Sequence, residues 1–114
     1  MADCLFCGIV AGEVAADRVT ENDAALAFRD ISPVAPKHSL VIPREHHANL
    51  AEVAAKAPDV LVAIVNLAAE VARIEGIDDS GYRLVANTGA GAHQTVFHAH
   101  LHVLGGRSMG WPPG

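Results

Sequence analysis

The chain has 114 residues, 51% of them hydrophobic, with only one Trp, one Tyr and three Phe. This length suits one compact domain over 1–114 with an aliphatic core. The net charge of −5 argues against broad nucleic-acid binding, which needs a basic face. No apolar run reaches the ~20 residues of a membrane span, and the N-terminus lacks the basic start of a signal peptide. We therefore expect a cytoplasmic protein with no nucleic-acid or membrane partner.

The first predicted elements are two strands. Residues 24–29 are apolar and then charged, and they precede a loop that holds two prolines. Residues 38–42 read as a second strand, which Pro43 ends because proline cannot donate to a central ladder.

Two helices are predicted next. Asn49 and Glu52 have the spacing of a capped helix start, which predicts a short helix over 49–55. A longer helix is expected from Pro58 to about Glu75, with Gly76 as the stop. Apolar residues at three- and four-residue steps give it a stripe that can dock on a sheet. The stripe consists of Leu61, Val65, Leu67, Ala68, Val71, Ala72 and Ile74.

Two further strands complete the predicted fold. Residues 82–87 alternate in polarity, and a last strand is expected from about 97 to 104. Several strands against one long and one short helix predict an α+β layered domain. The sheet edges carry little protective charge, so pairing into a dimer is credible.

The most informative segment is HAHLHVL, residues 98–104. In a strand, side chains alternate, so His98, His100 and His102 would share one face. One metal could hold the rings, or each ring could have its own task along a phosphate chain. The outer two would lie about 13 Å apart along the backbone, too far to share one ion easily, so the second interpretation is favoured. Neutral imidazole can attack phosphorus near pH 7. The central His100 is then the natural nucleophile, because it has a neighbour on each side to position it.

Cys4 and Cys7 form a CxxC motif that is too compact to staple distant segments. A redox motif is one interpretation, but no βαβ pattern accompanies it. Two thiolates at this spacing also hold zinc well, and then need two further ligands.

HAHLHVL, the DISP segment and the ending GGRSMGWPPG together resemble the histidine-triad (HIT) family, in particular its Hint branch of purine nucleoside phosphoramidase-like proteins. The resemblance runs from about Cys4 to the last residue. It implies a HIT fold, with an antiparallel sheet continued across a homodimer. It also implies hydrolysis of adenosine phosphoramidates or related adenylylated compounds through a covalent nucleotidyl-histidine.

The resemblance also implies catalytic roles at matching positions. His100 would attack the α-phosphate, His102 would contact the phosphate, and His38 would orient His100 through a hydrogen-bond relay. Thr95, where the branch commonly has Ser, would offer its hydroxyl above the phosphate. From the residues alone, His38 fits a buried structural histidine equally well.

Nucleotide binding would involve ten positions by the same resemblance. These are Phe28 and Ile31 at the purine, Asp30 at the ribose, Asn87, Gly89, Gln94, Thr95, His100 and His102 at the phosphate, and Trp111 near the leaving group. Trp111 would act across a dimer interface. The residues alone leave plainer interpretations open: Asn87 and Asp30 also suit turns, and Phe28 also suits a core.

Some HIT proteins pair a CxxC with two histidines, which implies a structural zinc held by Cys4, Cys7, His46 and His98, with His47 as the alternative to His46. Two alternative functions remain at this point. One is a dinucleoside polyphosphate hydrolase or nucleotidyl transferase, and the other is a nucleotide-binding interaction module with vestigial activity.

Overall fold

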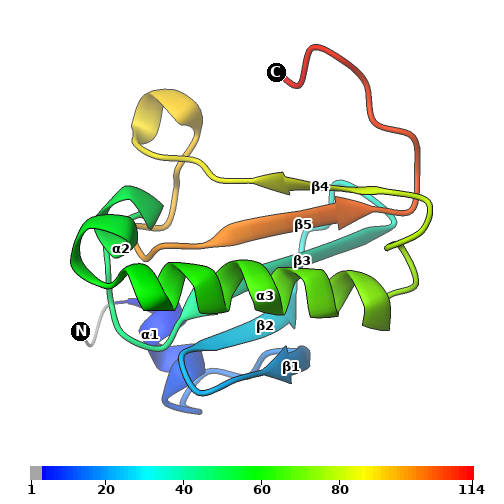
Figure 1. Cartoon of the computed structure of the whole chain (residues 1–114). Helices are drawn as coiled ribbons and strands as arrows, with labels where there is room; N and C mark the ends of the chain where they lie inside the picture. Colours follow the sequence, from blue (N-terminus) through cyan, green and yellow to red (C-terminus); the bar gives the residue numbers. More distant parts are fainter. Residues whose placement is uncertain (1–3) are drawn as a thin grey trace.

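The computed structural model describes residues 4–114 as a five-stranded antiparallel sheet with helices on both faces (Figure 1). The helices are α1 (Leu5–Val10), α2 (Leu50–Lys56) and α3 (Pro58–Ile74); the strands are β1 (Arg18–Glu21), β2 (Ala25–Arg29), β3 (Lys37–Pro43), β4 (Tyr82–Val85) and β5 (Leu101–Gly105). The strand order is β1-β2-β3-β5-β4, which confirms the predicted α+β class. Among residues 4–114, none of the helices has the length and apolar character needed to cross a bilayer.

The two faces of the sheet carry separate apolar clusters. On one face, α3 packs on residues of β2, β3 and β5, namely Ala25, Ala27, Val41, Leu101 and Val103. On the other face, the alternate residues Leu26, Phe28, Leu40 and Ile42 pack on Phe6 and Ile9 of α1. Alternation along each strand produces this division, and it leaves the polar positions His38 and His102 on the α1 face. We call this the site face.

Both predicted helices are confirmed. The side chain of Asn49 accepts the N–H of Glu52 at 2.9 Å, as the capped start of α2 requires. Pro58 is the first residue of α3, and Gly76 follows the helix with a φ of +72°, a conformation that glycine adopts without steric cost.

The predicted apolar stripe of α3 was too wide. The buried residues of α3 are Ile64, Leu67, Ala68, Val71 and Ala72. Val65 and Ile74, by contrast, are 46% and 51% exposed. At about 100° per residue, these two positions fall just beyond opposite flanks of the buried face.

Two short elements, α1 and β1, were not predicted, and the last strand begins later than expected. β5 starts at Leu101, so His98 and His100 lie in the segment before it and the three histidines do not share one strand face. The N–H of Ala99 donates to the carbonyl of His47 at 2.7 Å instead of joining the ladder. The alternating pattern of residues 97–104 therefore extends beyond the strand itself.

Candidate functional site

His38 and His102 form a pair on the site face of the sheet. His38 lies opposite Leu104 and Leu40 lies opposite His102, so the two histidines are diagonal neighbours on β3 and β5. His38 Nε2 is 2.9 Å from His102 Nδ1. The strand register therefore brings the rings into contact across 64 residues of sequence.

The hydrogen bonds of this pair assign the proton positions. The N–H of Val34 donates to His38 Nδ1 at 3.1 Å, so the proton of a neutral His38 is on Nε2. His38 Nε2 then donates to His102 Nδ1, which leaves the proton of His102 on Nε2. Burial, followed by the nearby His100 and His38, lowers the pKa of His102 to about 4. His102 is thus a neutral ring with an N–H to offer an anion.

His100 is ordered by a backbone carbonyl. Its Nδ1 lies 2.8 Å from the carbonyl oxygen of His98, which can only accept, so Nδ1 carries the proton and Nε2 carries the free lone pair. The ring is 8% exposed and lies 5.0 Å, centroid to centroid, from that of His102. Among the described residues, His38 makes no direct hydrogen bond to His100, so the predicted relay between them would have to pass through His102. His38 contacts His102, and the His98 carbonyl orients His100.

Two cavities meet at the histidines. One, of about 300 Å³, is mainly apolar and is lined by Phe6, Ile9, Phe28, Leu40 and Val96, with Ile31 at its rim, where that side chain is 96% exposed. The other, of about 410 Å³, is more polar and is lined by His38, Asn87 and His93. Both are lined by Asp30, Thr95, His100 and His102. The free nitrogen of His100 therefore belongs to a ring that borders an apolar and a polar compartment.

Asp30 is held in place at this junction. One carboxylate oxygen accepts the N–H of Ser32 at 2.8 Å, and the other is 3.4 Å from His38 Nε2. An ionised carboxylate only accepts hydrogen bonds, which suits hydroxyl donors such as those of a ribose.

Gln94 and Gly89 differ from the expected phosphate contacts. Gln94 is 3% exposed and lines neither cavity. Its Nε2 donates to the carbonyls of Ala48 and Val96, and its Oε1 accepts the N–H of Gly89 at 2.9 Å. These atoms brace the loop that carries Asn87 and Thr95, rather than pointing at a ligand.

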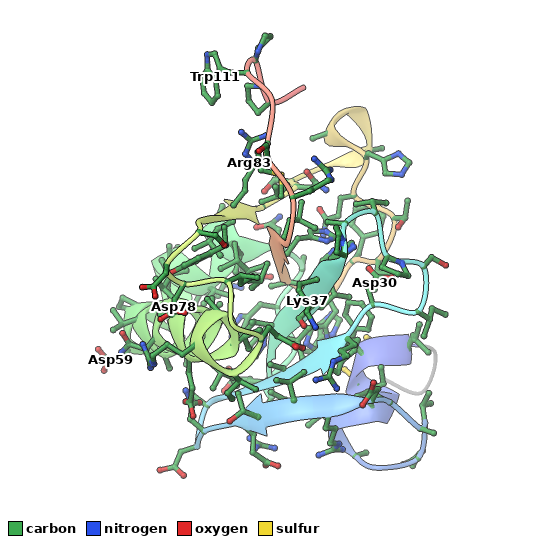
Figure 2. The ribbon with its side chains drawn as sticks, turned by 90° about the vertical axis from the view of Figure 1, so that its right-hand side faces the viewer. Asp30, Lys37, Asp59, Asp78, Arg83 and Trp111 are labelled. Atoms are coloured by element: carbon green, nitrogen blue, oxygen red, sulfur yellow. The ribbon has the colours of Figure 1, made fainter. Side chains whose placement is uncertain are left out.

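Trp111 is not brought to the site within one chain. It is 84% exposed and lies in the C-terminal tail, residues 106–114. The tail is attached at the edge of the sheet, where Arg83 Nη2 donates to the carbonyl of Gly110 at 2.8 Å. Figure 2 shows Trp111 at the end of the molecule beyond Arg83, away from Asp30.

Sequence reasoning missed several cavity residues. Leu5, Phe6 and Ile9 belong to a six-residue helix too short to give a periodic signal. His93 follows the short 3-10 turn Ala90–Ala92 with a φ of +64°, which is rare outside glycine, and it lines the polar cavity. The sequence signal that could have identified His93 is its position as a non-glycine residue in a glycine-rich loop.

The predicted metal ligands form one cluster. Cys4 Sγ lies 3.4 Å from His98 Nδ1, Cys7 Sγ lies 3.3 Å from His46 Nδ1, and the two Nδ1 atoms are 3.2 Å apart. Zinc bonds of 2.0–2.3 Å in a tetrahedron give ligand separations of about 3.3–3.6 Å for these pairs. The arrangement therefore fits a tetrahedral Cys₂His₂ zinc site. His47, the alternative ligand, lies outside the cluster, with its Nε2 3.3 Å from Glu45 Oε1.

The surroundings of the cluster support this fit. His98 Nε2 lies 2.9 Å from the carbonyl oxygen of Pro43 and donates to it, so the lone pair of His98 is on Nδ1, facing the other ligands. Burial, together with neighbouring Cys4, raises the pKa of the Cys7 thiol. A bound cation reverses that effect, because it favours the thiolate.

Comparison with known proteins identifies the family of this chain. The HIT domain profile matches residues 11–109. Escherichia coli purine nucleoside phosphoramidase is 41% identical over 95% of this chain and 91% of its own length, and a 14 kDa zinc-binding protein of Zea mays is 42% identical over 96% and 87%. A HIT family hydrolase structure from Legionella pneumophila has a TM-score of 0.93 at 48% identity, covering 98% of this chain and 100% of that one. The chain belongs to the HIT family, as the resemblance predicted.

Proposed function

We propose that this protein hydrolyses purine nucleoside 5′-phosphoramidates, or related adenylylated compounds, through a nucleotide bound covalently to His100. The observation that carries the proposal is the hydrogen bond from His100 Nδ1 to the His98 carbonyl. It leaves Nε2 as the atom with a lone pair, on a ring that borders both cavities. The relationship to the Escherichia coli phosphoramidase supports the substrate class.

The nucleotide would span the two cavities. The purine lies in the apolar cavity against Phe6 and Phe28, and the ribose hydroxyls donate to Asp30. The α-phosphate reaches the shared wall, where His102 Nε2–H donates to a phosphate oxygen. Asn87 and the Thr95 hydroxyl extend this contact toward the leaving group.

The reaction then has two steps. His100 Nε2 attacks the α-phosphorus, the new N–P bond forms, and the bond to the leaving amine breaks as the amine takes a proton from water. Water next attacks the same phosphorus, the N–P bond to His100 breaks, and the nucleoside monophosphate leaves. The His98 carbonyl stabilises the imidazolium of the intermediate, because it accepts the Nδ1 proton throughout.

Replacement of His100 tests this chemistry. His100→Ala should lower turnover of adenosine 5′-phosphoramidate by about 10⁴-fold while AMP still binds, as expected for a lost nucleophile. Mass spectrometry of the acid-quenched wild-type reaction should detect adenylylated protein, absent from the variant. Near-full turnover in His100→Ala would exclude the nucleophile assignment.

Two substrates separate this proposal from its alternatives. We expect a phosphoramidate to be cleaved faster than a dinucleoside polyphosphate by the same preparation. The reverse order would indicate a dinucleoside polyphosphate hydrolase. AMP binding without turnover of either compound would indicate an interaction module.

We further propose that Cys4, Cys7, His46 and His98 hold a structural zinc ion. All four positions are filled by protein ligands, so the site is closed, as structural zinc sites are. The zinc-binding relative from Zea mays supports this assignment. A metal held by reduced thiols also fits the cytoplasm as the compartment.

We also propose a homodimer that pairs along β4. This strand is an edge of the sheet, and Leu84 on it is 38% exposed. A second copy at this edge would receive the adjoining tail and its exposed Trp111. Light scattering should give twice the chain mass, and Leu84→Lys should shift it toward the monomer because an edge charge opposes pairing.

A further inference from the structure

The metal cluster and the proposed nucleophile share the residue His98. Its side chain is fully buried, with Nδ1 in the Cys₂His₂ cluster and Nε2 on the Pro43 carbonyl. Its own carbonyl accepts the Nδ1 proton of His100 at 2.8 Å. Any rotation of the 98–99 peptide would therefore move the acceptor that orients His100.

Phe6 makes a second connection from inside the CxxC motif. Its ring lies 5.3 Å from that of His100, edge-on at 90°, and 5.9 Å from that of His98. It also lies 5.5 Å from Phe28 and helps to line the apolar cavity. The residues between the two cysteines thus contact both the nucleophile and the proposed purine pocket.

The helix that holds Phe6 has little stability of its own. α1 is six residues long, far below the ~12 residues at which isolated helices become even marginal in water. Besides its apolar packing, the hydrogen bond from Arg18 to the Ile9 carbonyl at 2.7 Å attaches its C-terminal end. At its N-terminal end, Cys4 and Cys7 meet His46 and His98, so ligation there would fix the helix.

We propose that the Cys4–Cys7 segment is a positioning element for catalysis: metal held by the cluster fixes His100 through the His98 carbonyl, and fixes the purine pocket through Phe6. This rests on the proposed function for the identity of nucleophile and pocket. His98 acts here as a positioning residue, whereas Phe6 is part of the purine pocket itself. The metal itself takes no part in the reaction.

The first test compares zinc-loaded and chelator-treated protein. Long-range ¹H–¹⁵N NMR of the imidazoles should show His100 as the Nδ1–H tautomer with zinc, and as a mixture without it. AMP affinity should fall at least tenfold on zinc removal and return when zinc is restored. A folded, zinc-free protein with unchanged His100 signals and unchanged AMP affinity would overturn the proposal.

A second variant covers the case in which zinc-free protein unfolds. Phe6→Leu in the zinc-loaded protein should keep one zinc per chain but shift the His100 signals and weaken AMP binding about tenfold. Val10→Ala is the matched control, because Val10 lies on α1 but lines neither of the two cavities at the histidines. Equal effects of both variants would reduce Phe6 to a packing role and overturn the connection through α1.

The NMR readout also separates the two proposals. If zinc-loaded wild-type protein bound no AMP, the proposed function would fail. The NMR comparison of zinc-loaded and zinc-free protein would still show whether metal at the Cys4–Cys7 segment positions His100.

Discussion

Two clusters of potential metal ligands each contain one triad neighbour of His100, His98 in one and His102 in the other, and they differ in their hydrogen bonds. Cys4, Cys7, His46 and His98 form one, and Asp30, His38 and His102 form the other. In the first, the Pro43 carbonyl takes the Nε2 proton of His98 and leaves a lone pair facing its neighbours. In the second, the Val34 N–H occupies His38 Nδ1 and forces the proton onto Nε2, the atom that a metal would need.

The comparison teaches that backbone partners decide between metal and proton chemistry. Both clusters bring ligand-type atoms within 4.8 Å of one another. A carbonyl behind the ring prepares a metal ligand, whereas an amide N–H behind the ring prepares a hydrogen-bond donor. The first cluster therefore presents lone pairs, which suit a cation, and the second presents an N–H, which suits an anion.

The largest expected effect comes from the first cluster. Zinc at a thousandfold excess over its Kd should stabilise the fold by about 4 kcal/mol, which corresponds to a rise in Tm of more than about 10 °C for a domain of this size. Differential scanning fluorimetry with and without a chelator measures this. Cys7→Ser should lose the response to zinc, and a Cys7→Ser protein that still gained 10 °C would contradict the assignment.

The second prediction concerns the donor to His102. His38→Ala leaves the partly buried Nδ1 of His102 without its partner, at a cost of about 1–3 kcal/mol. Because each 1.36 kcal/mol is tenfold in rate, kcat/KM on a phosphoramidate should fall roughly 5- to 150-fold. Zinc content should remain unchanged, measured by metal analysis of the same sample. Loss of zinc together with activity would show that the two clusters are not separate.

The third prediction concerns pH. The folded pKa of His102 is about 4, below its ordinary value of 6.5, so only the unfolded chain takes up this proton as the pH falls from about 6.5 toward 4. The contribution of His102 to stability is complete above pH 6.5 and is lost across this window. Urea unfolding at several pH values should show a steeper loss in wild type than in His102→Gln. Parallel curves would contradict the assigned burial of the neutral ring.

The last prediction is that a substitution in the second cluster leaves zinc binding unchanged. Asp30→Asn removes the carboxylate of the second cluster, yet zinc binding should stay at one ion per chain with unchanged affinity. Isothermal titration with zinc measures both quantities. A drop in stoichiometry from two to one would mean that Asp30, His38 and His102 hold a metal after all.

Periodicity and local spacing predicted the α+β class and the larger elements of the fold, whereas the cavity residues that were predicted came mainly from the resemblance to the HIT family. The strands at 25–29 and 37–43 and both larger helices followed from alternation, caps and proline positions. Asp30, Asn87, Thr95, His100 and His102 all line the cavities.

What could not be predicted depends on backbone groups and on distant contacts. The carbonyl that orients His100 belongs to every residue type and leaves no sequence signal. Gln94 could not be recognised as a brace, because its partner carbonyl in Ala48 is 46 residues away. The bend that directs His98 into the metal cluster interrupts a pattern that looks continuous in one dimension.

The diagonal contact between His38 and His102 ties the chemistry to the alignment of two strands. A slip of β5 by one residue would turn His102 toward α3 and bring Leu101 and Val103 out onto the site face. The cost of exposing those aliphatic side chains is what prevents such a slip. The apolar core on the α3 face of the sheet therefore fixes how the histidines on the site face are aligned.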